Sequence, residues 1–199
     1  MSGEALRMEL TDEERSEKTF RNIDFSNADL SGSEFWKCTF ADCDLSYADL
    51  RDCSFEACSF TECNISNVSV DNAKFINAKF ETCKLLGIKF FKCSQFSFEV
   101  HMDACKLSLC NFTDQKMKRC GITNSSVDEC FFQNAFLVET DFSNTSFQNT
   151  LFHNCDLQKA NFTNARGYAI DPLNNKIRKA KFSVPDVLNL LSGFGIEIK

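Results

Sequence analysis

The sequence predicts an all-β fold in which the chain winds into a four-sided parallel β-helix. Every fifth residue is apolar from Phe20 to Phe90 and again from Met102 to Phe162, which makes twenty-eight positions without a miss. The residue two places before each of them is mostly alanine, serine, threonine or cysteine. Fifteen of the 22 phenylalanines occupy the apolar positions, so phenylalanine serves as a repeated part of the fold.

Neither regular secondary structure explains a period of five. An α-helix would spread this period around its surface, and a flat strand would place successive apolar residues on opposite faces. The pattern fits a chain that turns a corner every five residues, with the apolar and the small residue both facing inward. Four sides make a coil of about twenty residues, and coils stack by parallel pairing about 4.8 Å apart. We therefore expect about seven coils, with Phe20, Phe40 and Phe60 in one inward column.

The domain organisation follows from where the repeat begins, breaks and ends. We expect residues 1–17 to form an N-terminal arm or cap, 18–166 the β-helix and 167–199 a C-terminal extension. Twelve residues separate Phe90 from Met102 where ten would keep the register, so segment 91–101 holds two extra residues. It forms either a bulge on one side or a bend that presents Phe96 or Phe98 to a partner.

The C-terminal extension has the signals of a short α-helix. Ser183 is a suitable N-cap, Pro185 lies in the first turn and Gly193 ends the helical spacing. We expect the helix to cap the last coil, to cover a twin helix in a homodimer, or to do both. Its predicted capping and dimerisation residues are Val184, Val187, Leu188, Leu191 and Phe194.

The twelve cysteines are predicted to fill the small inward-facing position two residues before the apolar one, which we call the wall position. Eleven of them lie two residues before a repeat centre, where chance would place about one in five, and the twelfth, Cys93, lies at the start of the break in the repeat. Cysteine behaves there as a small apolar residue. The chain has only two histidines, His101 and His153, and neither is near a cysteine pair. We expect no metal, no cofactor and no catalytic thiol.

Acidic charge is concentrated at the start of the chain. Residues 1–60 hold 14 acidic and 6 basic side chains, and the remaining 139 hold 14 and 16. One interpretation is that aspartate at the repeat positions only serves turn hydrogen bonding. The other is an anionic rod that imitates DNA in a basic protein channel. The predicted acidic partner-binding face consists of Asp24, Asp29, Glu34, Asp42, Asp44, Asp49, Asp52 and Glu62.

A second candidate surface is apolar. Phe131 and Leu151 are twenty residues apart and should be neighbours on one outer side, with Phe136 on the next side. An exposed apolar patch of this kind is typical of a contact surface. A protein partner and the chain's own C-terminal helix are both possible covers.

The repeats resemble a known family. Ala28-Asp29-Leu30-Ser31-Gly32 and Ala48-Asp49-Leu50-Arg51-Asp52 match the A(D/N)LXX motif of pentapeptide-repeat proteins. Segments 19–40 and 190–198 are similar to the Qnr and MfpA type, although no long loop interrupts the repeats here. The resemblance implies a right-handed quadrilateral β-helix and a C-terminal dimer helix. It also implies binding to DNA gyrase or topoisomerase IV as a DNA mimic, with quinolone resistance.

Composition narrows the remaining function classes. We find no glycine-rich phosphate loop and no nucleophile–base set, which favours a binding protein over an enzyme. The alternative to the topoisomerase ligand is a rigid scaffold for an unknown protein.

A net charge of -6 argues against direct nucleic-acid binding. No apolar run approaches the roughly 20 residues of a membrane helix, and the first 20 residues have no signal-peptide core. We expect a cytoplasmic protein.

Overall fold

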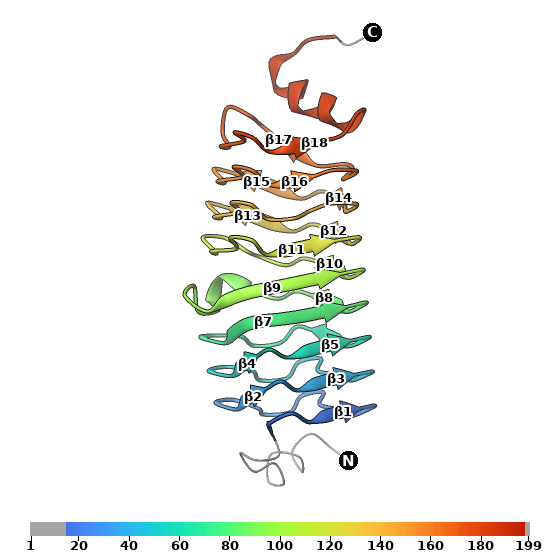
Figure 1. Cartoon of the computed structure of the whole chain (residues 1–199), viewed down its shortest axis with the longest axis vertical. Coiled ribbons are helices and arrows are strands. Elements are labelled where there is room, and N and C mark those ends of the chain that lie inside the picture. Colours follow the sequence, from blue (N-terminus) through green and yellow to red (C-terminus); the bar gives the residue numbers. More distant parts are fainter. Residues whose placement is uncertain (1–14, 198–199) are drawn as a thin grey trace.

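In the computed structural model, which describes residues 15–197, the chain winds into a four-sided parallel β-helix of about eight coils (Figure 1). Paired residues are twenty apart, as in Phe20↔Phe40 and Phe40↔Phe60. The predicted fold class is confirmed, but the expectation of seven coils was too low. The chain makes one more circuit after residue 166, because Phe162 still pairs with Phe182.

The strands are short and fall on four sides. Side 1 holds β1 (Thr19–Arg21), β3 (Thr39–Ala41), β5 (Ser59–Thr61), β11 (Gly121–Thr123), β16 (Asn161–Phe162) and β18 (Lys181–Phe182). Side 2 holds β6 (Asn64–Ser66), β8 (Lys84–Leu86), β10 (Lys106–Ser108), β12 (Ser126–Asp128) and β14 (Ser146–Gln148). Side 3 holds β13 (Phe131–Gln133), β15 (Leu151–His153) and β17 (Ala169–Ile170), and side 4 holds β2 (Glu34–Trp36) and β4 (Ser54–Glu56). Two longer strands, β7 (Lys74–Glu81) and β9 (Phe98–Asp103), run from side 4 across a corner onto side 1.

The interior is built from columns of stacked rings. On side 1, ring centroids are 5.0 Å apart for Phe20 and Phe40, and 4.8 Å for Phe40 and Phe60. Phe40 is fully buried and Phe60 is 2% exposed. The predicted column is therefore confirmed. Neighbouring columns meet edge to face, as Phe40 and Phe55 do, which is the arrangement that the ring quadrupole favours.

Each corner is made by a residue in the left-handed region, two places after the inward apolar residue. Asn22, Asn27 and Asp42 have φ of 53°, 58° and 53°. Asparagine, aspartate and glycine tolerate this conformation best, which explains their frequency at these positions. Tyr47 and Ala57 adopt it as well, with φ of 61° and 53°. The corner is thus imposed by the coil and not only by local preference.

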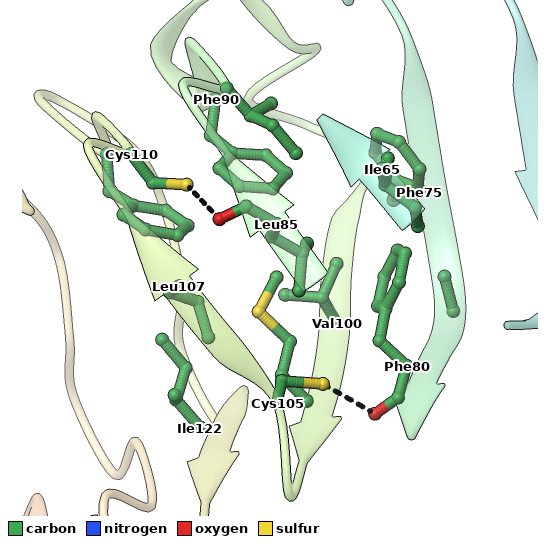
Figure 2. Packing of buried hydrophobic residues seen from close by; sticks show 14 of the residues in the cluster. Ile65, Phe75, Phe80, Leu85, Phe90, Val100, Cys105, Leu107, Cys110 and Ile122 are labelled. Carbon is green, nitrogen blue, oxygen red and sulfur yellow. Dashed lines mark hydrogen bonds between the residues drawn. The ribbon is translucent and has the colours of Figure 1, made fainter. Parts of the chain in front are cut away.

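The cysteines lie in the walls, and they also act as donors. Figure 2 shows the Cys105 and Cys110 thiols donating to the carbonyls of Phe80 and Leu85 in the preceding coil, at 3.5 and 3.4 Å. Thr140 and Thr145 make the same contact at 2.7 Å with their hydroxyl groups. The wall position therefore favours residues that are small and that can donate a hydrogen bond inside a dry core.

The wall position makes the thiols inert in the folded protein. All twelve cysteines are free and buried, which keeps reagents away from them, and burial raises the pKa of Cys53 and Cys58 to about 12. Hydrogen bonds with Cys83 and Cys130 lower the pKa of Cys105 and Cys110, but both of these thiols are buried as well. Because the thiolate is the reactive form, we expect fewer than one equivalent to react with Ellman's reagent at about pH 8. All twelve should react in guanidinium chloride at about 6 M, where the chain is unfolded. Rapid reaction of several thiols in the native state would show that the walls open.

The two extra residues of segment 91–101 are absorbed between sides 3 and 4. After the 3₁₀ turn η2 (Phe90–Lys92) the chain bulges, and Phe98 replaces the expected residue 95 as the inward side chain. Val100, paired with Ala78, takes the small wall position of the next side. Phe96 is 90% exposed, whereas Phe98 is buried, so only Phe96 is available to a partner.

The C-terminal helix is more tightly wound than expected. η3 (Asp186–Phe194) is a 3₁₀-helix rather than an α-helix, and it follows the last coil at the C-terminal end of the rod (Figure 1). Its N-cap is Pro185, while the predicted cap Ser183 instead accepts a hydrogen bond from the Asn164 N–H. A 3₁₀ geometry brings every third residue onto one face, so the residues that pack against the last coil differ from those predicted for an α-helix.

Only part of the predicted helix set reaches the core. Val187 packs against it, and Leu190, which sequence reasoning missed, is the buried residue of η3. Val184, Leu188, Leu191 and Phe194 remain exposed, at 82%, 41%, 36% and 50%. Capping of the last coil therefore depends on Val187 and Leu190.

Candidate functional site

The predicted acidic residues do not share one side of the rod but encircle its first coils. We call this set of eight residues the acidic band. Asp24 and Asp44 lie on side 2, Asp29 and Asp49 on side 3, and Glu34 on side 4. Asp42 and Glu62 occupy the corner after side 1, and Asp52 the corner after side 3. A partner that uses all of them must surround the rod.

Four aspartates of the acidic band have a structural task. The Oδ1 atoms of Asp24, Asp29, Asp44 and Asp49 each accept a hydrogen bond from the backbone N–H two residues later, at 2.8 to 3.1 Å. Hydrogen bonds from Ser26 lower the pKa of Asp24. This contact holds the chain as it approaches the corner.

Asparagine performs the same task elsewhere in the chain. Asn111 and Asn161 accept the N–H two residues later at 2.8 and 3.1 Å, with the same geometry as the aspartates. At the corners of the C-terminal half, Asn124, Asn144 and Asn164 form an amide ladder with contacts of 3.0 and 3.1 Å. The fold therefore requires an acceptor at these sites but does not require a negative charge.

The negative charges are also stacked on one another. Asp24 pairs with Asp44 and Asp29 with Asp49 in adjacent coils, so like charges lie about 5 Å apart. Ion pairs at the surface compensate part of this charge: Arg21 contacts Asp42 at 3.1 Å, and Arg51 contacts both carboxylate oxygens of Asp49. Exposed pairs contribute little to stability. The acidic band is an arrangement that stability alone does not select.

The outer apolar residues fall into two places. Phe131 and Leu151 are direct partners in β13 and β15 on side 3, and they are 43% and 44% exposed, so this adjacency is confirmed. Phe136 lies on side 4 between Lys116 and Asp156. It belongs to a different surface, where it lines a groove with Phe96.

The sequence reasoning missed a basic surface on side 4. At the corner that follows side 4, three coils bring Arg119, Glu139 and Lys159 together, and both basic groups contact the carboxylate at 2.8 Å. These contacts lower the pKa of Glu139 to about 2. Its signal in the sequence was the run Lys176-Ile177-Arg178-Lys179, which can be placed next to Lys159 only when the last coil is known.

Two kinds of feature are absent from the described part of the chain. Between residues 15 and 197 no group of three or more histidine, cysteine, aspartate or glutamate side chains is arranged to hold a metal ion. No helix in the same range is long and apolar enough to cross a membrane.

The stacked coils, the five-residue period and the left-handed corners define the class of pentapeptide-repeat proteins. The family described as Pentapeptide repeat region matches residues 33–99, and that described as Pentapeptide repeats (8 copies) matches residues 135–166. The chain is a pentapeptide-repeat protein. No curated protein sequence gives a match.

Among solved structures, the chain is similar to QnrB1, a plasmid-mediated fluoroquinolone resistance protein. A trypsin-treated variant of QnrB1 is 24% identical, with a TM-score of 0.59 over 92% of this chain and 89% of that one. Full-length QnrB1 is 17% identical, with a TM-score of 0.59 over 91% and 99% of the two chains. At this identity the likeness concerns the fold.

Proposed function

We propose that the protein is a non-enzymatic ligand of a type II topoisomerase, DNA gyrase or topoisomerase IV, and that its acidic band imitates DNA. One observation carries the proposal: aspartate occupies sites where asparagine, used elsewhere in the same chain, would satisfy the fold. The resemblance of segments 19–40 and 190–198 to the Qnr and MfpA type supports the choice of partner. Protection against quinolones would follow if the ligand displaces DNA from the drug-bound enzyme.

The distribution of the acidic band suits a channel better than a flat surface. Duplex DNA presents charge on all sides, at about one charge per 1.7 Å of axis. The acidic band also presents charge on all sides, although at a lower density. A basic channel that normally holds DNA would contact Asp24, Asp29 and Glu34, on three different sides, at the same time.

The C-terminal helix supports a homodimer as part of this proposal. Leu188, Leu191 and Phe194 of η3 are exposed at the end of the rod opposite the acidic band (Figure 1). Burial of apolar side chains against a second copy would remove them from water. The two acidic bands would then lie at the outer ends of one longer rod.

The proposal is tested by neutralising charge without losing the turn acceptor. In the variant Asp24→Asn/Asp29→Asn/Asp44→Asn/Asp49→Asn, each amide oxygen keeps the acceptor, so the fold should be retained. We expect inhibition of gyrase supercoiling by the wild-type protein at micromolar concentration. The variant should need at least about tenfold more protein, which corresponds to about 1.4 kcal/mol lost over four surface charges, of which Asp24 is exposed and the other three are half-buried.

The matched control is Asp141→Asn/Asp156→Asn. These aspartates accept N–H groups in the same way, at 2.9 and 3.2 Å, but lie outside the acidic band. The control should inhibit as the wild type does. If the wild-type protein neither inhibits nor rescues supercoiling, the topoisomerase proposal is wrong.

A second candidate, a scaffold for another protein, is favoured by the exposed Phe131 and Leu151 pair. A scaffold would keep its partner in the fourfold asparagine variant and lose it in Phe131→Ser/Leu151→Ser. The two variants together therefore distinguish the candidates.

A further inference from the structure

Side 4 carries an open groove next to the register break. Ile76, Phe96, Phe98 and Phe136 supply its apolar walls, and its volume is about 460 Å³. Its polar rim has two lysines, Lys116 and Lys118, against one carboxylate, Glu99. The two extra residues of segment 91–101 create it, because they push Phe96 out of the coil while Phe98 turns inward. Lys116 Nζ lies 4.6 Å from the centre of the Phe96 ring, a cation–π contact that holds the ring over the groove.

The groove opens onto a run of positive charge that continues to the C-terminal end of side 4. Pairing between coils places residues 116–119, 136–139, 156–159 and 176–179 one above another. These segments contain seven basic and two acidic residues, a net charge of +5. We call the seven basic residues the basic strip: Lys116, Lys118, Arg119, Lys159, Lys176, Arg178 and Lys179.

Most of the basic strip is uncompensated. All seven residues are exposed, and Arg119 and Lys159 share the single carboxylate of Glu139. Within residues 15–197, no carboxylate lies within ion-pair distance of Lys116, Lys118 or Arg178. Asp156 is occupied by the Gln158 N–H at 3.2 Å. Cations aligned in this way repel one another unless an anion binds them.

We propose that side 4 binds an acidic segment of a partner protein that carries one large apolar side chain. The apolar side chain would enter the groove between Phe96 and Phe136, and carboxylates would contact the basic strip. Phe136 and Asp156 already pair with the coils on both sides, so the middle of this surface has no free edge to which a segment could add a strand. Recognition must come from side chains.

The geometry sets the length of the segment. Four coil steps of about 4.8 Å separate the level of Phe98 from that of Arg178, about 19 Å in all. An extended chain of about six residues spans this distance. The acidic band does not repel such a segment strongly, because Glu34, its member on side 4, is about 19 Å from Lys116 and the Debye length is about 8 Å.

The test uses fluorescence anisotropy with a fluorescein-labelled peptide of one tryptophan followed by six glutamates, and the full chain. We expect saturable binding that weakens as salt rises. Lys116→Glu/Lys118→Glu should weaken binding at least about tenfold, and Phe96→Ala should weaken it by about tenfold as well. A peptide with glycine in place of the tryptophan should bind the wild type about tenfold less tightly than the tryptophan peptide does. The Phe96→Ala variant should bind the two peptides with equal affinity.

The matched control is Lys84→Glu/Lys106→Glu, which reverses two stacked lysines on side 2. It should leave peptide binding within about twofold of the wild type. Equal weakening by both double variants would show that binding depends on the net charge of the protein and not on side 4, which would overturn the proposal. Binding of a DNA duplex to the same lysines, without peptide binding, would overturn it in favour of a phosphate-binding surface. Neither result depends on the acidic band, so the topoisomerase proposal stands or falls separately.

Discussion

Replacement of Phe60 by alanine is expected to destabilise the protein by about 3–5 kcal/mol, because it removes a whole ring from the middle of a buried stack. Phe60 lies 4.8 Å from both Phe40 and Phe80, with interplanar angles of 7° and 6°, and meets Phe55 edge to face at 5.5 Å. Removal of the ring leaves a cavity that the rigid coils above and below cannot close. Equilibrium unfolding in guanidinium chloride measures the loss.

Phe96→Ala is the control for this prediction. Phe96 is 90% exposed, so its removal should change the free energy of unfolding by less than about 0.5 kcal/mol. A small effect at Phe60 would mean that the column collapses into the space, and the close packing of the ring columns would be wrong.

Replacement of Gly167 by alanine is expected to cost about 3 kcal/mol. Gly167 has φ of +68°, and an added Cβ would lie 2.3 Å from the carbonyl oxygen of Phe147. That contact is far inside the van der Waals distance, and the atom that must move is backbone. The substitution also carries the left-handed cost of about 1–2 kcal/mol. Thermal and denaturant unfolding of the variant measure the sum.

Gly32→Ala separates the two contributions. Gly32 has φ of +69°, but an added Cβ there would meet nothing within 4 Å. It should cost only about 1–2 kcal/mol, the conformational part. Similar losses at Gly32 and Gly167 would show that the coil at Phe147 yields easily, contrary to the prediction.

The sequence was sufficient for the fold because the information is repeated. Phe20, Phe40 and Phe60 occupy the same inward position in three successive coils. The five-residue period therefore remains visible in the sequence even where one repeat departs from it. The spacing located the break at segment 91–101 and allowed a bulge there. It did not show that Phe98 would take the inward place of residue 95, because a bulge can shift the register in more than one way.

The candidate site was less accessible to sequence reasoning. The acidic residues were identified, but their arrangement around four sides depends on which corner each one follows, as with Asp42 and Asp52. The basic strip escaped because Arg119 and Lys159 are forty residues apart and meet only through Glu139. The docking of Leu190 escaped because η3 is a 3₁₀-helix, whose faces differ from those of an α-helix.

The uniform pairing of residues about one coil apart has a kinetic consequence. All-β proteins usually fold slowly, because distant parts of the chain must find each other before any ladder forms. Here each ladder joins residues about twenty apart, as in Leu107↔Val127, so the relative contact order is on the order of 0.1, a value typical of helical bundles. Once one circuit closes, its edge templates the next at the same small entropic cost. Folding can therefore begin at any closed coil and propagate toward both ends of the chain.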